Sequence, residues 1–172
     1  MEDRIYQLRI QLFHVKPKVW RSFIVPGDIT LDRLHDVAQI VMGWTDSHQH
    51  SFTIGKKRYT ERPESSREGV EEGRHRLVNL VKKNGRTFEY WYDFGGENAC
   101  PPEDVGGSPG YQQFLAAVTD PEDILHEEYK SWYGGVFDPG AFNLDEVNNT
   151  LLAYRRWSRG RYEDFFPGYP RW

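Results

Sequence analysis

The sequence predicts an α+β fold, with a sheet in the first half of the chain and helices in the second. Apolar and polar residues alternate over residues 6–12 and again over 87–94, which is the period of a half-buried strand. Between them, residues 30–43 repeat apolar side chains every three or four positions, as a helix with one buried side does. An aromatic share of 15% predicts a core rich in Phe, Tyr and Trp.

The N-terminal elements follow from local signals. A turn at Pro17 separates the strand over 6–12 from a second strand over 19–25, and the two predict a hairpin. The helix is expected to begin after Thr30 and to end at Gly43, with its apolar stripe on Leu31, Leu34, Ala38 and Val41. We expect its polar residues to lie on the solvent side: Asp32, His35, Asp36 and Gln39.

Further strands are expected over 48–54, at 58–59 and over 87–94, with an exposed loop over 61–76 and an apolar turn over 77–81. A hairpin, one crossing helix and a return to the sheet is the element order of the β-grasp (ubiquitin-like) fold. We therefore predict a β-grasp core, in which the strand from Tyr6 lies parallel to the strand from Thr87 with the helix across one face. An order of elements does not by itself indicate a function.

Charge divides the chain into three predicted regions. Residues 1–96 form the β-grasp-like core, residues 97–157 an acidic helical lobe packed on it, and residues 158–172 an Arg/aromatic tail that we expect to pack on the lobe. Residues 97–153 carry one Lys and 11 Asp or Glu. Helices are expected over 111–118, 124–132 and 144–157.

Composition and charge indicate which classes of partner and which cellular compartment to expect. The acidic middle would repel a phosphate backbone, so nucleic acid is disfavoured and a protein partner or small ligand is favoured. A lone cysteine, Cys100, excludes an intrachain disulfide and fits a reducing cytoplasm. The start at Met1 shows no signal-peptide pattern and the apolar runs are too short to cross a membrane, so we expect a cytoplasmic protein.

His48 and His50 are the strongest candidates for chemistry. Two positions apart on a strand, their imidazoles would point the same way and could seat a metal ion. Further ligands would have to come from the acidic and thiol side chains of Asp46, Asp93, Cys100 and Glu103. The alternative is that both histidines continue the apolar face that follows them and cap the core. We favour this alternative and expect no cofactor, with a divalent metal as the second reading.

A loop over 101–110 is rich in glycine and proline. Its candidate binding residues are Glu103, Asp104, Gly106 and Gly107, because glycines allow a ligand to approach the backbone closely. Turn chemistry alone also explains this composition, so a rigid connector is the preferred interpretation. Acidic neighbours would raise the pKa of a thiol, which favours a structural rather than a reactive Cys100.

Three stretches together resemble the plasmid pRiA4b open-reading-frame-three-like family. The motifs run over Val19-Trp20-Arg21 with 31–35 and 42–52, then Tyr92-Asp93-Phe94-Gly95, then 100–107 with 134–139. The resemblance covers residues 5–152. It implies an occurrence in chromosomes, plasmids and transposons, and some members carry a transposon-resolvase label. No nucleophilic serine with an arginine cluster, as such an enzyme needs, stands out in the sequence.

One departure from the family pattern stands at Gly95. Members of the family continue from this motif with an Asp, a Trp and a His and then another strand, whereas here Gly95 is followed by Gly96, Glu97 and Asn98. Either the chain has lost this extension or the sequence omits a stretch. A missing family histidine weakens any site that it would complete.

The first functional hypothesis is a non-catalytic binding or interaction module, accessory to plasmids or transposons, so an enzyme is the less favoured class. Its binding face would combine Gln7, Arg9 and Gln11 with Glu89, Trp91 and Asp93. One alternative is a metal-dependent hydrolase or nuclease that uses His48 and His50. Another is a nucleic-acid-binding accessory protein whose arginines and aromatic rings grip the strand.

Overall fold

The computed structural model of the protein describes residues 4–16, 18–65, 67–83, 85–92, 105–138 and 141–160. The chain divides into two compact units. Unit 1 consists of residues 1–10 and 20–94, and unit 2 consists of residues 11–19 and 95–172. The connection of the N-terminal hairpin is thus grouped with the second half of the chain.

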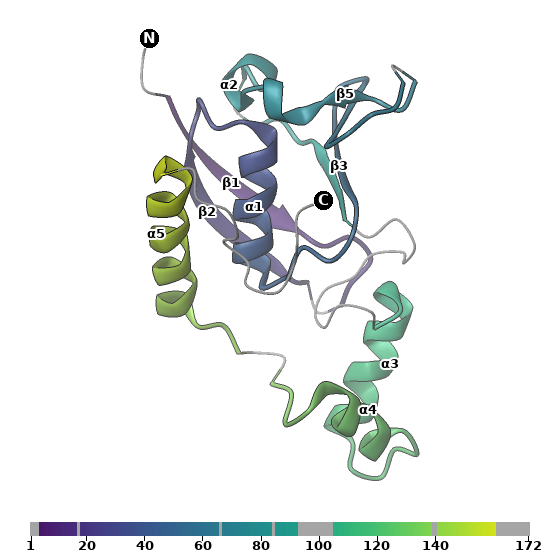
Figure 1. The fold of residues 1–172 in the computed structure, drawn as a ribbon. Coiled ribbons are helices and arrows are strands. Elements are labelled where there is room, and N and C mark those ends of the chain that lie inside the picture. Colours follow the sequence, from purple (N-terminus) through teal and green to yellow (C-terminus); the bar gives the residue numbers. More distant parts are fainter. Residues whose placement is uncertain are drawn as a thin grey trace. The chain divides into compact units, whose positions relative to one another are not determined.

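Unit 1 contains two sheets in its described residues. The first has two strands, β1 (Ile5–Gln11) and β2 (Trp20–Pro26), with helix α1 (Leu31–Met42) beside them (Figure 1). The second sheet has the strand order β5-β4-β3-β6. Its strands are β3 (His50–Ile54), β4 (Lys57–Thr60), β5 (Val70–Glu71) and β6 (Glu89–Tyr92). The predicted α+β class is confirmed.

The predicted β-grasp core is not confirmed. In the described part of the chain, β1 pairs with β2 and β6 pairs with β3, so the first and last strands of unit 1 belong to different sheets. The parallel pairing of these two strands, which the prediction requires, is not observed there. The physical reason is that alternation assigns each strand a buried face but does not select its neighbour.

Strand β3 lies in the middle of the second sheet and is antiparallel to both of its neighbours. Phe52 is opposite Tyr59 of β4 and opposite Tyr90 of β6. Phe52 and Ile54 are buried, as the alternation predicted. Ser51, which points to the other face, is also only 1% exposed, because a central strand is covered on both sides.

Helix α1 is buried along nearly its whole length. Its apolar stripe is confirmed, and Asp32 is exposed as predicted. The prediction that His35, Asp36 and Gln39 face solvent is wrong, since their exposed fractions are 4%, 5% and 0%. The helix contacts β2 and also the short helix η1 (Glu72–Arg74), so its polar side is covered as well.

The segment predicted to be an exposed loop contains ordered elements at its end. Strand β5 pairs in parallel with β4, and η1 follows it directly. Glu72, the first residue of η1, is 1% exposed, so the prediction of an exposed loop is wrong for this part. The predicted apolar turn that follows is helix α2 (Leu77–Leu80), with Leu77 fully buried.

Unit 2 is helical. Helices α3 (Gly107–Thr119), α4 (His126–Tyr133) and α5 (Leu144–Gly160) lie where helices were predicted. Among its described residues, Val15, Val105, Tyr111 and Phe114 form a cluster of buried side chains. The predicted tail lies outside the described residues from position 161 onward.

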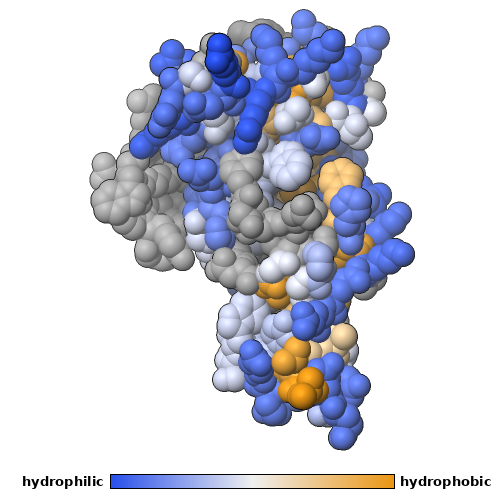
Figure 2. Space-filling model, turned by 90° about the vertical axis from the view of Figure 1, so that its right-hand side faces the viewer, coloured by the Kyte–Doolittle hydropathy of each residue, from blue (hydrophilic) through white to orange (hydrophobic). Residues whose placement is uncertain are grey.

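The surface carries both charged and apolar regions. The face in Figure 2 is mostly hydrophilic, with apolar colour at its lower end over α3 and α4. Among the described residues of this region, Ile124 and Val136 are 95% and 88% exposed. Within the described part of the chain, the helices are too short or too polar to cross a bilayer.

Candidate functional site

A group of six polar side chains lies in the interior of unit 1, and we call it the polar cluster. Its members come from α1, from the segment after α1, from β3, from η1 and from β6; they are His35, Gln39, Asp46, His50, Glu72 and Tyr90. Buried polar groups cost free energy unless they are hydrogen-bonded. The partners of each group therefore show how the cluster is held.

The end of α1 brings Asp46 back toward the helix. Gly43 takes a left-handed conformation with φ 77°, and its N–H donates to the carbonyl of Gln39, which also accepts from the N–H of Trp44. Asp46 has a positive φ of 61°, which few residues other than glycine adopt. This turn places the Asp46 carboxylate beside His35, one helical turn before Gln39.

Four residues of the polar cluster form a closed ring of hydrogen bonds. The Asp46 N–H donates to Oε1 of Gln39 (3.1 Å), and Nε2 of Gln39 donates to the Tyr90 hydroxyl (2.8 Å). That hydroxyl lies 2.7 Å from Nδ1 of His35, and Nε2 of His35 lies 2.6 Å from Oδ1 of Asp46. Because a carboxylate only accepts, Nε2 of His35 donates to Asp46, and a neutral His35 ring then accepts from the Tyr90 hydroxyl at Nδ1. Every bond in the ring then has one donor and one acceptor.

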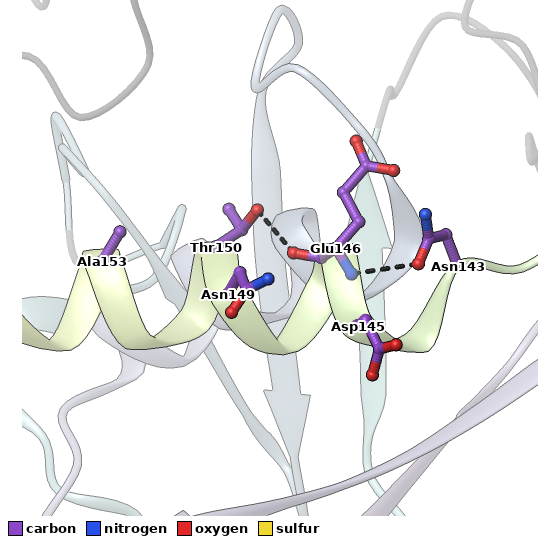
Figure 3. A pocket seen from close by; sticks show the side chains of 6 residues that line it. All are labelled: Asn143, Asp145, Glu146, Asn149, Thr150 and Ala153. Atoms are coloured by element: carbon purple, nitrogen blue, oxygen red, sulfur yellow. Dashed lines mark hydrogen bonds between the residues drawn. The ribbon is translucent and has the colours of Figure 1, made fainter.

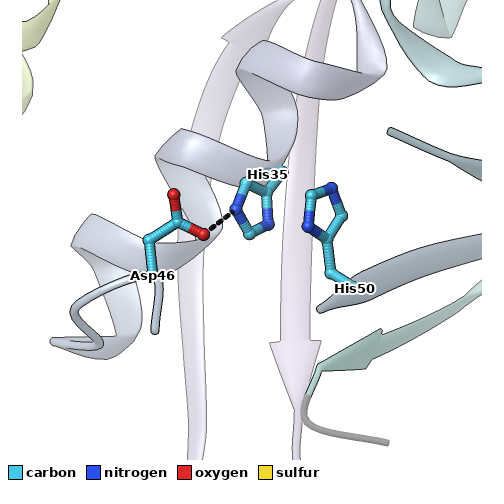
Figure 4. A group of neighbouring side chains, drawn as sticks. All are labelled: His35, Asp46 and His50. Carbon is cyan, nitrogen blue, oxygen red and sulfur yellow. Dashed lines mark hydrogen bonds and ion pairs between the residues drawn. The ribbon is translucent and has the colours of Figure 1, made fainter. Parts of the chain in front are cut away.

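His50 lies on the other side of His35 and has its own acidic partner. Its Nε2 is 2.7 Å from Oε1 of Glu72, and the two side chains are 7% and 2% exposed. The second oxygen of Glu72 is buried and has no hydrogen-bond partner among the described residues. The imidazole rings of His35 and His50 are stacked (Figure 4).

Tyr90 works in this cluster as a hydrogen-bond donor. Burial raises its pKa well above 10, and this effect outweighs the hydrogen bond from Gln39, which lowers the pKa. The nearby charges of Asp46 and Glu72 raise the pKa further. The hydroxyl therefore stays protonated at neutral pH, which does not suit a phenolate nucleophile.

The cluster also has the donor set of a metal site. His35, Asp46 and His50 each offer one ligand atom, and these three atoms lie within 4.8 Å of one another. Imidazole nitrogen with carboxylate oxygen suits zinc and other divalent transition metals.

The structure places the predicted site residues in different surroundings. Asp46 and His50 belong to the polar cluster. His48 does not; its ring packs edge-on against Tyr92, with centroids 5.6 Å apart. The other acidic and thiol candidates lie outside the described residues, and these are Asp93, Cys100, Glu103 and Asp104. Gly106 and Gly107 stand at the start of α3, where Gly106 has φ 87°.

Sequence reasoning missed four members of the polar cluster, His35, Gln39, Glu72 and Tyr90. A signal for the first two was present, because positions four apart on a helix lie on one face and both residues border the apolar stripe. Glu72 carried no such signal, since it lies in a segment of charged residues.

A hollow on the surface of the described residues lies along α5 (Figure 3). Its lining consists of Asn143, Asp145, Glu146, Asn149, Thr150 and Ala153. Two of its hydrogen bonds stay within the helix, from the Glu146 N–H to Asn143 Oδ1 and from Thr150 Oγ1 to the Glu146 carbonyl. A hollow lined by one helix lacks the converging groups of a binding site, so the polar cluster is the stronger candidate.

The fold has a counterpart among solved structures. The crystal structure of the protein of unknown function MM3350 from Methanosarcina mazei Go1 matches with a TM-score of 0.76. The match covers 86% of this chain and 99% of that chain at 24% sequence identity. A likeness at this identity supports the fold alone.

A curated relative is closer in sequence. The uncharacterized protein y4hQ of Sinorhizobium fredii (strain NBRC 101917 / NGR234) is 34% identical over 189 residues, which cover 92% of this chain and 97% of y4hQ. Because this alignment is longer than the chain's 172 residues, it contains positions that y4hQ fills and this chain does not.

The family model for the plasmid pRiA4b ORF-3-like proteins matches in two segments, residues 4–97 and 95–146. The segments meet at the Gly95 motif, where the sequence departs from the family pattern. Together they cover most of the chain, in agreement with the motifs that carry the resemblance. The chain belongs to the plasmid pRiA4b ORF-3-like family.

Proposed function

We propose that the protein is a non-catalytic binding module that recognises a protein partner through the outer face of its β1–β2 sheet. This outer face consists of Ile5, Arg9, Trp20 and Ile24. The observation that carries the proposal is the exposure of its large apolar side chains, with Ile5, Trp20 and Ile24 at 69%, 48% and 70%.

The chemistry of this face suits protein recognition. The guanidinium of Arg9 lies over the Trp20 ring, 4.4 Å from its centroid. Tryptophan and arginine are the residue types most enriched among those that dominate binding energy in protein interfaces. Gln7 and Ser22 lie between the two apolar ends and hydrogen-bond each other at 3.3 Å. A complementary partner would offer an apolar surface.

The backbone of the hairpin supports the same proposal. In the described part of the chain, β1 and β2 pair only with each other, so each has a second edge that no strand occupies. An exposed edge can accept an extended partner segment as an additional strand. The face predicted from the sequence also included Glu89 and Trp91, which are exposed on β6 in the other sheet.

The test uses two tryptophans of equal exposure. A photo-crosslinking amino acid at Ile24 should yield one defined protein adduct in extracts of the cell that carries the gene. Trp20→Ala should abolish this adduct, whereas Trp91→Ala, which removes an equally exposed ring from the other sheet, should leave it. An adduct that both variants lose equally, or the lack of any defined adduct, would refute the proposal.

The enzyme alternative is favoured by one observation, the proximity of His35, Asp46 and His50. A hydrolytic metal centre also needs an open position that water can reach. His35 and His50 are 4% and 7% exposed, and only Asp46, at 25%, extends substantially into solvent. This burial supports a binding module over an enzyme.

A further inference from the structure

We propose that His35 Nε2, Asp46 Oδ1 and His50 Nδ1 bind one divalent transition-metal ion of the zinc class. The proposal is separate from the β1–β2 face, since an ion at this position would join α1 to β3 whether or not a partner binds the hairpin. It also differs from the second reading of the sequence, a metal on His48 and His50, because His48 has no part in this set.

The first support comes from the hydrogen bonds of the ring nitrogens that would not bind the ion. A metal-bound histidine usually donates its other ring N–H to a carboxylate, a carbonyl or a hydroxyl oxygen. Here Nε2 of His50 lies 2.7 Å from Glu72, and Nδ1 of His35 lies 2.7 Å from the Tyr90 hydroxyl. The contact with Glu72 leaves Nδ1 of His50 for an ion. On His35, an ion at Nε2 would replace the proton donated to Asp46, and Nδ1 would then carry the ring proton toward the Tyr90 hydroxyl.

The second support is that some polar atoms inside the cluster make no hydrogen bond. Nδ1 of His50 makes no hydrogen bond with the described residues, and neither does the buried Oε2 of Glu72. A buried polar atom without a partner in a native protein calls for an explanation, and an ion nearby is one of the few. An ion on His50 would fix this ring as the donor to Glu72 and so strengthen that hydrogen bond.

Charge leads to the same conclusion. With neutral imidazoles, the cluster contains two carboxylates, Asp46 and Glu72, and no lysine or arginine among its members. One divalent cation would neutralise both. The positive φ of Asp46 also holds its carboxylate at His35, and such strained conformations concentrate at ligand sites.

Binding of an ion would require the stacked rings of His35 and His50 to move relative to each other. A metal ion lies in the plane of each imidazole that binds it, and one ion cannot lie in two parallel planes. Ion binding therefore tilts the His50 ring out of the stack. The nitrogens must also approach to about 2.0–2.1 Å from the ion, so the 4.8 Å group must contract.

Untagged protein, first stripped with a chelator, is titrated with Co²⁺ and then with competing Zn²⁺. We expect a visible Co²⁺ absorption band that saturates at one ion per chain and disappears on Zn²⁺ addition. Zn²⁺ should also raise the melting temperature of the stripped protein, because it binds the folded state.

Conservative variants test the assignment of ligands. Asp46→Asn keeps an oxygen that accepts from His35 and should lose the saturating band. Glu72→Gln keeps the acceptor for His50 and should weaken Co²⁺ affinity by about 10–100-fold, as loss of an outer partner does. Asp32→Asn is the matched control, because Asp32 is an exposed acid on α1, the helix that carries His35. This variant should bind Co²⁺ as the wild type does.

The failures of the two proposals are distinguishable, because the metal titration does not involve the β1–β2 face. Wild-type protein that shows neither a saturating band nor a Zn²⁺-dependent melting temperature would overturn the metal site even if the variants fail to fold. Full affinity in Asp46→Asn would overturn it as well.

Discussion

The imidazole rings of His35 and His50 stack with their centroids 3.4 Å apart and their planes 7° apart. If both rings were protonated to imidazolium, their positive charges would repel each other, and the two rings would have to move apart. Nδ1 of His35 lies 2.7 Å from the Tyr90 hydroxyl, which also accepts from Nε2 of Gln39. The stack thus depends on a hydroxyl that belongs to neither histidine.

Tyr90→Phe should therefore lower the free energy of unfolding by about 1–3 kcal/mol, since it leaves Gln39 and His35 each with an unpaired buried group. Urea denaturation of the metal-free protein measures this change. Tyr133→Phe is the control, because this tyrosine is 43% exposed and should change stability by less than about 0.5 kcal/mol. Equal effects of both substitutions would show that the ring of hydrogen bonds does not hold the cluster.

The sequence predicted most secondary structure of unit 1 and the pairing of β1 with β2, but not the sheet to which β6 belongs. Period-two alternation identified β1, β3 and β6, and helical spacing identified α1, because burial on one side leaves a regular pattern. The assignment of β6 to the sheet of β3 depends on contacts between distant parts of the chain. No local pattern encodes these contacts, and the β-grasp analogy supplied a neighbour that the described residues do not show.

The site was predicted in part for the same reason. His50 was singled out because it stands two positions after His48 on a predicted strand, and Asp46 because it is the acidic residue nearest to this pair in the sequence. His35 and Gln39 were assigned to solvent, because polar residues on an amphipathic helix usually face water. The rule failed because η1 covers this side of α1, and η1 lies within a charged segment whose burial depends on tertiary contacts.

Adjacent residues of β2 should respond differently to threonine. Ile24→Thr on the exposed face should change the free energy of unfolding by less than about 0.5 kcal/mol. Val25→Thr on the opposite face, where the side chain is 2% exposed, should lower the free energy of unfolding by about 1–3 kcal/mol. Threonine has nearly the size of valine, but its hydroxyl would be buried in place of a methyl group. Thermal and urea melts measure both. A large cost for Ile24→Thr would mean that this face is covered in the folded protein and unavailable to a partner.

The turn that places Asp46 depends on Gly43. Its φ of 77° is left-handed, and a Cβ added there meets no atom within 4 Å, so a substitution costs conformational energy without a clash. Gly43→Ala should lower the free energy of unfolding by about 1–2 kcal/mol. Gly43→Asn should cost less, because asparagine tolerates this conformation. Should the two variants prove equally stable, the left-handed turn is not what determines the position of Asp46.

Among the described glycines of unit 2, Gly110 in α3 leaves the least room for a side chain. A Cβ at this position would lie 2.0 Å from the carbonyl oxygen of Val105, and a backbone atom cannot move aside as the end of a side chain can. Val105 also belongs to the core of unit 2, together with Tyr111 and Phe114, so a shift of its carbonyl would disturb the packing of both rings.

Gly110→Ala should therefore destabilise the protein by more than about 2 kcal/mol, within the range of overpacked interiors. Gly135→Ala is the matched control, because a Cβ there meets no atom within 4 Å and its φ is not left-handed. Urea denaturation followed by tryptophan fluorescence compares the two variants. If Gly110→Ala matched the control, the approach of Val105 to the first turn of α3 would not exist in solution, and the start of this helix would have to follow a different path.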